Sequence, residues 1–168
     1  MQETTQQYIQ RMLGYVEGKD PLKIQQSTPR KLAAAIRGKT KKRLDRRPAP
    51  GKWSVTEILA HLADTELVAA WRMRLILGQN GAPVHAFDQD VWAGAFRYQG
   101  MDPRKSLERF RVLREANVAL LKSLSKEQWE NYGMHQERGK ETIGHIVRMF
   151  AGHDLNHLVQ VEGLAKGR

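Results

Sequence analysis

Apolar residues return every three or four positions along three long stretches of this chain, near residues 54–77, 102–124 and 141–166. That spacing places them on one side of an α-helix, so each stretch predicts an amphipathic helix. Ser54 and Glu57 form a capping-box sequence, which favours a helix start directly after Ser54. No run of residues alternates between apolar and polar at the period of a β-strand. The pattern therefore predicts an all-α fold.

A fourth helix is predicted to begin at Thr28, which suits the capping position, and Pro29, which suits the first turn. Together these helices predict a four-helix bundle over residues 28–166, with residues 1–27 as a short helical extension at the N-terminus. Because 168 residues suit one hydrophobic core better than two, we expect a single domain over residues 1–168.

Two connections between the predicted helices differ in character. The first, residues 79–101, is long and contains Trp92 and Phe96, so we expect a short helix that packs against the bundle. Connections of this length in a compact domain often shape a binding site. The second, residues 131–140, is predicted to be a loop.

The composition excludes several classes of chemistry. The chain has no cysteine, which excludes disulfide bonds, thiolate metal ligands, iron–sulfur clusters and a cysteine nucleophile. No apolar run approaches the length that spans a bilayer. The first seven residues lack the charged and then apolar pattern of a signal peptide, so we expect a cytoplasmic protein with no membrane partner.

The formal net charge is +10, and much of the excess lies in residues 39–47, which we call the basic run. Short runs of this kind are commonly a solvated helix end and loop. The other interpretation is a site for phosphate, an anionic substrate or nucleic acid. The sequence leaves both interpretations open.

Two histidines four residues apart, His153 and His157, fall within the last predicted helix. Side chains at this spacing project from one face of a helix with Cβ atoms about 6 Å apart, which suits two imidazoles on one metal ion. His61 lies on another predicted helix of the same bundle. We therefore expect these three histidines to meet and to bind a divalent metal, although such residues are also common as ordinary core or surface histidines.

Asp64 follows His61 by three positions and so lies on nearly the same helix face. It could bind the metal, orient a histidine from behind, or act as a base toward bound water. The competing interpretation is an ion pair with Arg72 or Arg74. Both alternatives stay open from the sequence.

Three segments together resemble the DinB/YfiT-like superfamily: Gly51–Ser54 (GKWS), Glu57–Asp64 (EILAHLAD) and Gly152–Gln160 (GHDLNHLVQ). The resemblance runs from about residue 15 to residue 165. It implies a four-helix bundle whose second and fourth helices supply a three-histidine metal site that is open to water. The positions that match are His61, His153 and His157, with zinc, nickel or iron as the metal.

The resemblance also implies an activity class. Characterised relatives include S-transferases and isomerases that use a low-molecular-weight thiol, and others are described as metal-dependent hydrolases because of the site. Three protein ligands leave an open position for water or a thiolate, and a metal lowers the pKa of either. Members of the family often form homodimers, so a homodimer is a further expectation.

Two functions from different classes follow. The first is a metal-dependent enzyme, either a hydrolase or a low-molecular-weight-thiol S-transferase, acting on an unidentified small molecule. The alternative is a non-catalytic stress-response or nucleic-acid-binding bundle that uses its basic surface. Only the first requires the histidines to bind a metal.

Overall fold

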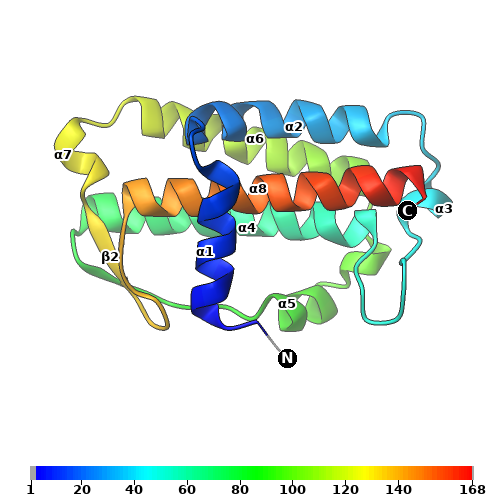
Figure 1. The fold of residues 1–168 in the computed structure, drawn as a ribbon, viewed down its shortest axis with the longest axis horizontal. Helices are drawn as coiled ribbons and strands as arrows, with labels where there is room; N and C mark the ends of the chain where they lie inside the picture. The colour runs from blue at the N-terminus through cyan, green and yellow to red at the C-terminus, as the bar shows by residue number, and fades with distance from the viewer. Residues whose placement is uncertain (1–2, 168) are drawn as a thin grey trace.

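The computed structural model describes residues 3–167, and most of them are helical (Figure 1). The α-helices are α1 (Thr5–Val16), α2 (Pro21–Ile36), α3 (Lys41–Leu44), α4 (Val55–Gly78), α5 (Gln89–Ala95), α6 (Pro103–Lys122), α7 (Lys126–Trp129) and α8 (Ile143–Lys166), with a 3₁₀ turn, η1 (Tyr98–Gly100). The strands are β1 (Ala82–Val84), β2 (Tyr132–His135) and β3 (Gly139–Thr142). The long helices α2, α4, α6 and α8 form the predicted four-helix bundle.

The predicted helix starts of α4, α6 and α8 are confirmed, because each is held by a side-chain cap. Ser54 and Glu57 form a complete capping box at α4. Asp102 accepts hydrogen bonds from the main chain of the first turn of α6, and Thr142 does the same at α8. These caps satisfy main-chain N–H groups that have no partner inside a helix.

The predicted start of the first bundle helix at Thr28 is wrong, because α2 already begins at Pro21. Asp20 caps it by accepting hydrogen bonds from the main chain of the first turn, and a cap followed by Pro is a complete start signal. Pro29 therefore lies inside the helix, where it has no N–H to offer the carbonyl of Gln25. That carbonyl instead accepts a hydrogen bond from Arg114 of α6, at 3.0 Å.

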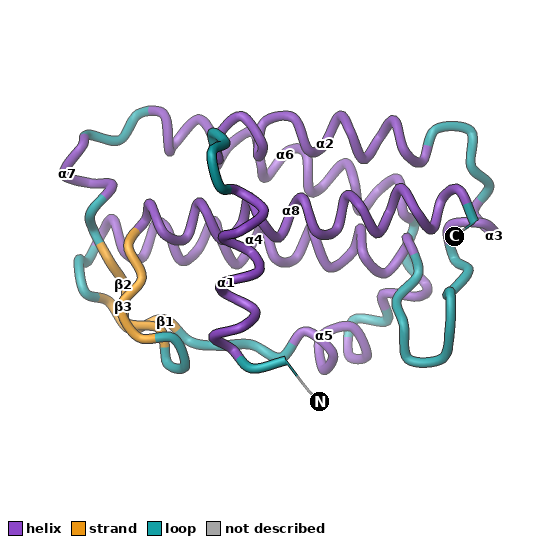
Figure 2. The backbone as a smooth tube through the Cα atoms, viewed as in Figure 1, coloured by secondary structure: helices purple, strands orange, loops and turns teal. Residues whose placement is uncertain are grey.

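A small sheet corrects the expectation that the chain has no strands and that residues 131–140 form a loop. β1 pairs in parallel with β2, and β2 pairs antiparallel with β3, at one end of the bundle (Figure 2). Strands of three and four residues are too short to show alternation in the sequence. Pro83 lies in β1, an edge strand, where a missing N–H is tolerated.

The long connection after α4 contains the predicted short helix. Its aromatic rings stack on one another: the centroid of Trp92 lies 4.6 Å from that of Phe87 and 5.3 Å from that of Phe96. This segment runs beneath the bundle in Figure 2 and covers one side of α4.

Helix α1 lies across α8 instead of joining the bundle as a fifth parallel helix (Figure 1). The crossing is close at Gly152, where an added Cβ would overlap the main-chain carbonyl of Met12. Glycine is required there because the two backbones touch. No helix among residues 3–167 is long and apolar enough to cross a membrane.

Candidate metal centre

The three predicted histidines converge inside the bundle. His61 comes from α4, whereas His153 and His157 come from consecutive turns of α8. The Nε2 atom of His153 lies 2.9 Å from Nε2 of His61 and 3.1 Å from Nε2 of His157. One ring nitrogen from each residue lies within 4.8 Å of both others. Among the described residues, this is the one group of three with metal-binding geometry.

The donor set and its spacing fit a divalent metal. Three nitrogens bound at ~2.1 Å to one tetrahedral ion would lie roughly 3.4 Å from one another, close to the contacts in the cluster. The residues are only 2%, 9% and 8% exposed for His61, His153 and His157, so water competes little for the ligands. Three imidazoles suit zinc, nickel and iron alike.

Burial keeps the imidazoles neutral, which is the form that binds a metal. It lowers the pKa of His157 to about 4, although the hydrogen bond with Gln160 opposes the shift. Burial, followed by the charge of His157, holds the pKa of His61 well below its usual value. The pKa of His153 is lowered in the same way, first by burial and then by the other two rings. All three lone pairs are therefore available at neutral pH.

Two polar side chains behind the cluster fix ring orientations. The Oε1 atom of Gln160 lies 2.8 Å from Nδ1 of His157. A carbonyl oxygen can only accept, so Nδ1 carries the proton and Nε2 is left free to bind. The Thr65 hydroxyl lies 3.3 Å from Nδ1 of His61 and 3.4 Å from its Nε2, so it contacts the edge of that ring without selecting a tautomer. Neither residue was predicted from the sequence, although spacings of three and four positions from a histidine are the signal that finds them.

Asp64 lies on α4 but belongs to a different contact. Its Oδ2 accepts a hydrogen bond of 2.7 Å from the hydroxyl of the buried Tyr98. Neither alternative partner pairs with it: Arg72 donates to the main-chain carbonyl of His85, and Arg74 donates to Ala70 and Asn117. The role of Asp64 as a base, or as a group behind a ligand, stays a prediction.

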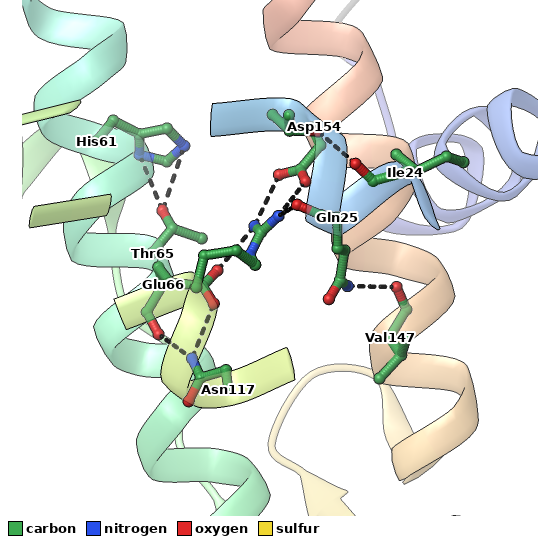
Figure 3. A network of polar contacts seen from close by, with 10 residues as sticks. Ile24, Gln25, His61, Thr65, Glu66, Asn117, Val147 and Asp154 are labelled. Atoms are coloured by element: carbon green, nitrogen blue, oxygen red, sulfur yellow. Dashed lines mark hydrogen bonds and ion pairs between the residues drawn. The ribbon is translucent and has the colours of Figure 1, made fainter. Parts of the chain in front are cut away.

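A second buried polar cluster lies directly behind the histidines, and the sequence analysis did not find it (Figure 3). Arg114 contacts both carboxylate oxygens of Asp154, at 2.5 and 3.0 Å, and Glu66 at 2.8 Å. The Asn117 amide donates to Glu66 at 2.8 Å. Burial alone would lower the pKa of Arg114, but the charges of Asp154 and Glu66 outweigh it and raise that pKa. We call this set the ionic cluster.

Two neighbouring cavities reach the histidines. A cavity of about 590 Å³ touches His153 and His157, and its wall includes Tyr8 and Arg11 of α1. A smaller cavity of about 270 Å³ touches His61 and His153, and it shares Tyr8, Gln89 and His153 with the first. The cluster is thus buried among protein atoms yet adjoins space for small molecules.

The basic run is partly used inside the molecule. Lys41 pairs with Asp45 at 2.6 Å, and Arg47 pairs with Glu57, the buried capping residue of α4. These contacts fasten the connection between α2 and α4. Both cations are therefore neutralised in part, which reduces the surface charge available for a partner.

Comparison with known proteins identifies the family. The model of the DinB superfamily matches residues 26–161. A protein of Oceanobacillus iheyensis named "Putative metal-dependent hydrolase" is 28% identical over 138 residues, which cover 82% of this chain and 80% of the relative. "Putative metal-dependent hydrolase YfiT" of Bacillus subtilis is 26% identical over 147 residues, covering 86% and 82%.

A solved structure shows the same fold. YfiT from Bacillus subtilis, described as having an unusual four-helix bundle topology, superposes with a TM-score of 0.81 at 21% identity. The match covers 97% of this chain and 88% of that one. Given the family match over most of its length, this chain belongs to the DinB superfamily.

Proposed function

We propose that this protein is a metal-dependent hydrolase that binds one divalent ion through His61, His153 and His157. The observation that carries the proposal is the convergence of three neutral Nε2 atoms at the meeting point of two cavities. The names of the relatives agree with it. When bound, a divalent ion supplies a Lewis acid and lowers the pKa of a water molecule in its open position.

The chain supplies positioning and water exclusion. The three histidines present their ring nitrogens to the site from three fixed directions. The hydrogen bond from His157 to Gln160 fixes the tautomer of one ring. Trp53 covers the cluster, with its ring centroid 5.0 Å from that of His61. Asp64 lines neither cavity, and the Tyr98 hydroxyl holds its carboxylate, so its role as a base is the part of the proposal that needs its own test.

Thiol transfer is the second candidate. A transfer reaction needs room for two reactants, and two neighbouring cavities that share His153 offer that room. A low-molecular-weight thiol would take the open position as its thiolate. Hydrolysis needs only one organic substrate, and therefore only one of these cavities.

The test is elemental mass spectrometry on untagged protein, with His61→Ala and His157→Ala as variants. His145→Ala is the matched control, because His145 lies on α8 near the site but pairs with Glu141 instead of the cluster. We expect about one equivalent of metal in wild type and control, and none in the two variants. Equal metal content in all four proteins would contradict the proposal that these histidines bind the metal.

The reaction class is decided with the metal-loaded protein. Ester and amide hydrolysis is measured alone, and transfer is measured with a thiol and an electrophile. Asp64→Asn keeps the shape of the side chain but removes its basicity. If Asp64 is the base, we expect about 10²- to 10⁴-fold lower kcat with unchanged metal content. Unchanged kcat would remove Asp64 from the mechanism.

A further inference from the structure

Arg72 is a buried cation with no carboxylate partner. It lies on α4 and is 6% exposed. One guanidinium nitrogen donates to the main-chain carbonyl of His85 at 2.7 Å, and the group lies 5.8 Å from the ring centroid of Phe87. Among residues 3–167, it forms no ion pair within 4.0 Å. Charged groups that are this well buried are normally paired, so the exception calls for a reason.

Other arginines near the bundle interior follow the rule. Arg114 contacts two carboxylates, and Arg138 binds both oxygens of Glu141 at 2.7 and 2.9 Å. Arg138 lines the same 270 Å³ cavity as Arg72. The cavity therefore contains one guanidinium that contacts a carboxylate directly and one that does not. Besides burial, the charge of Arg138 lowers the pKa of Arg72, and the nearby charges of Glu141 and Glu137 raise it.

The cavity joins Arg72 to the histidines. Its wall contains both Arg72 and two of the proposed ligands, His61 and His153. Arg72 follows His61 by 11 positions on α4, which is about three turns, so the two residues lie within roughly 20° of the same helix face. The rise between them is about 16 Å, and arginine side chains lean back toward the N-terminus of their helix, which shortens the gap.

The rest of the wall is largely apolar. Phe87, Met149 and Phe150 contribute apolar side chains to the wall, and Tyr8, Thr65 and Gln89 contribute polar groups. Burial lowers the pKa of Arg72 to about 10, so the group stays charged at neutral pH. The cavity thus offers a cation with planar donors and, about three helix turns away along α4, the ligand nitrogens, together with apolar wall.

We propose that the Arg72 guanidinium binds the carboxylate of a substrate whose reacting group lies at the histidines. A single guanidinium without a direct carboxylate contact suits a monocarboxylate better than a phosphate dianion, because its two parallel N–H donors match the two oxygens of a carboxylate. The apolar wall favours a short aliphatic or aromatic spacer. This inference rests on the proposed function for the identity of the reacting end, but the carboxylate site is testable without metal.

The experiment is a titration of metal-free protein with 3-phenylpropanoate, followed by ¹H–¹⁵N NMR, which also measures weak binding. The neutral 3-phenylpropanamide is the chemical control. The proteins are wild type, Arg72→Gln, Arg72→Lys and Arg148→Gln. Arg148 is an exposed cation on α8 and so controls for net charge.

We expect the carboxylate to bind wild type and Arg148→Gln equally, and Arg72→Gln about tenfold or more weakly. The carboxylate affinity of Arg72→Lys should lie between those of wild type and Arg72→Gln, because lysine keeps the charge and lacks the paired planar donors of the guanidinium. The amide should not distinguish wild type from Arg72→Gln. Equal carboxylate affinity in wild type and Arg72→Gln, or no binding to wild type, would overturn the proposal. Thermal unfolding of each variant verifies that it is folded.

His157→Ala separates this inference from the proposed function. We expect that variant to lose metal and to keep its affinity for the carboxylate. If wild type binds no metal but its carboxylate affinity depends on Arg72, the hydrolase proposal fails and the anion site stands. If metal binds and Arg72→Gln has no effect on the carboxylate, the reverse holds.

Discussion

Two consecutive residues of α8, His153 and Asp154, belong to buried polar clusters with opposite electrostatics. His153 faces two other histidines and, among the described residues, no carboxylate is part of its group. Asp154 faces Arg114, which also binds Glu66. One cluster is a set of neutral donors that a cation would complete. The other already contains its own cation.

This difference in charge indicates which of the two clusters would be completed by a bound ion. Neutral imidazoles with lowered pKa values gain little from one another, and their nitrogens are close enough to share an ion. In the ionic cluster, Arg114 contacts two carboxylates directly, and its side-chain and main-chain contacts link α2, α4, α6 and α8. We therefore expect the ionic cluster to determine stability and the histidine cluster to determine function.

The largest expected effect is on the ionic cluster. Arg114→Met should lower the free energy of unfolding by about 3–5 kcal/mol, because it leaves two buried carboxylates without a cation. Urea denaturation measures it. Adding Glu66→Gln and Asp154→Asn to Arg114→Met removes those charges and should recover part of the loss. A loss below 1 kcal/mol would mean that the contacts of Arg114 contribute little.

The second prediction concerns pH and the metal-free protein. The pKa of His157 falls from 6.5 in the unfolded chain to about 4 in the folded one. Between these values the unfolded chain binds more protons, so stability decreases as pH falls. The slope is about 1.4 kcal/mol per pH unit for each such histidine. His157→Leu should give a shallower slope than wild type in urea melts from pH 7 to pH 4.5, and equal slopes would contradict the assignment.

The third prediction tests whether the hydrogen bond from His157 to Gln160 contributes to metal affinity. Gln160→Ala should weaken metal binding about 10- to 100-fold, because His157 loses the acceptor that fixes its tautomer. Competition with a chelator of known affinity measures the change. Glu162→Ala is the control, since Glu162 is on the same helix and outside both cavities. An unchanged affinity in Gln160→Ala would show that the hydrogen bond is incidental.

The smallest expected effect concerns Arg72. Arg72→Met should leave the free energy of unfolding unchanged or raise it by about 1 kcal/mol, since it removes a buried charge with no carboxylate partner. This is opposite in sign to Arg114→Met, and the two variants are compared in one set of urea melts. A large loss in Arg72→Met would show that its contact with His85 is structural.

The sequence was sufficient where the information is local. The spacing of His153 and His157 determines a shared helix face, and Ser54 with Glu57 determines where α4 begins. His61 was predicted as their partner because it lies on another helix of the same predicted bundle, and the family resemblance implied the same three positions. The ionic cluster was missed because the partners of Arg114 lie 40 or more positions away, and no spacing rule relates them.

Other errors arose from competition between local signals. Thr28–Pro29 reads as a helix start, but Asp20–Pro21 supplies an equally good one earlier, and Arg114 satisfies the carbonyl that Pro29 leaves free. β1 pairs with β2 across more than 40 residues, so its partner could not be identified from a short segment. β2 and β3 are adjacent in the sequence but have four residues each, which is too short to show alternation.

The close crossing of α1 and α8 at Gly152 determines how near α1 lies to the histidine site, and so the size of the cavity beside it. Tyr8 and Arg11 of α1 wall the larger cavity, and the crossing holds that helix against the main chain beside His153. A side chain at Gly152 would lift α1 without altering any proposed ligand. We therefore expect a substitution at Gly152 to change the size of this cavity from a position that does not line it.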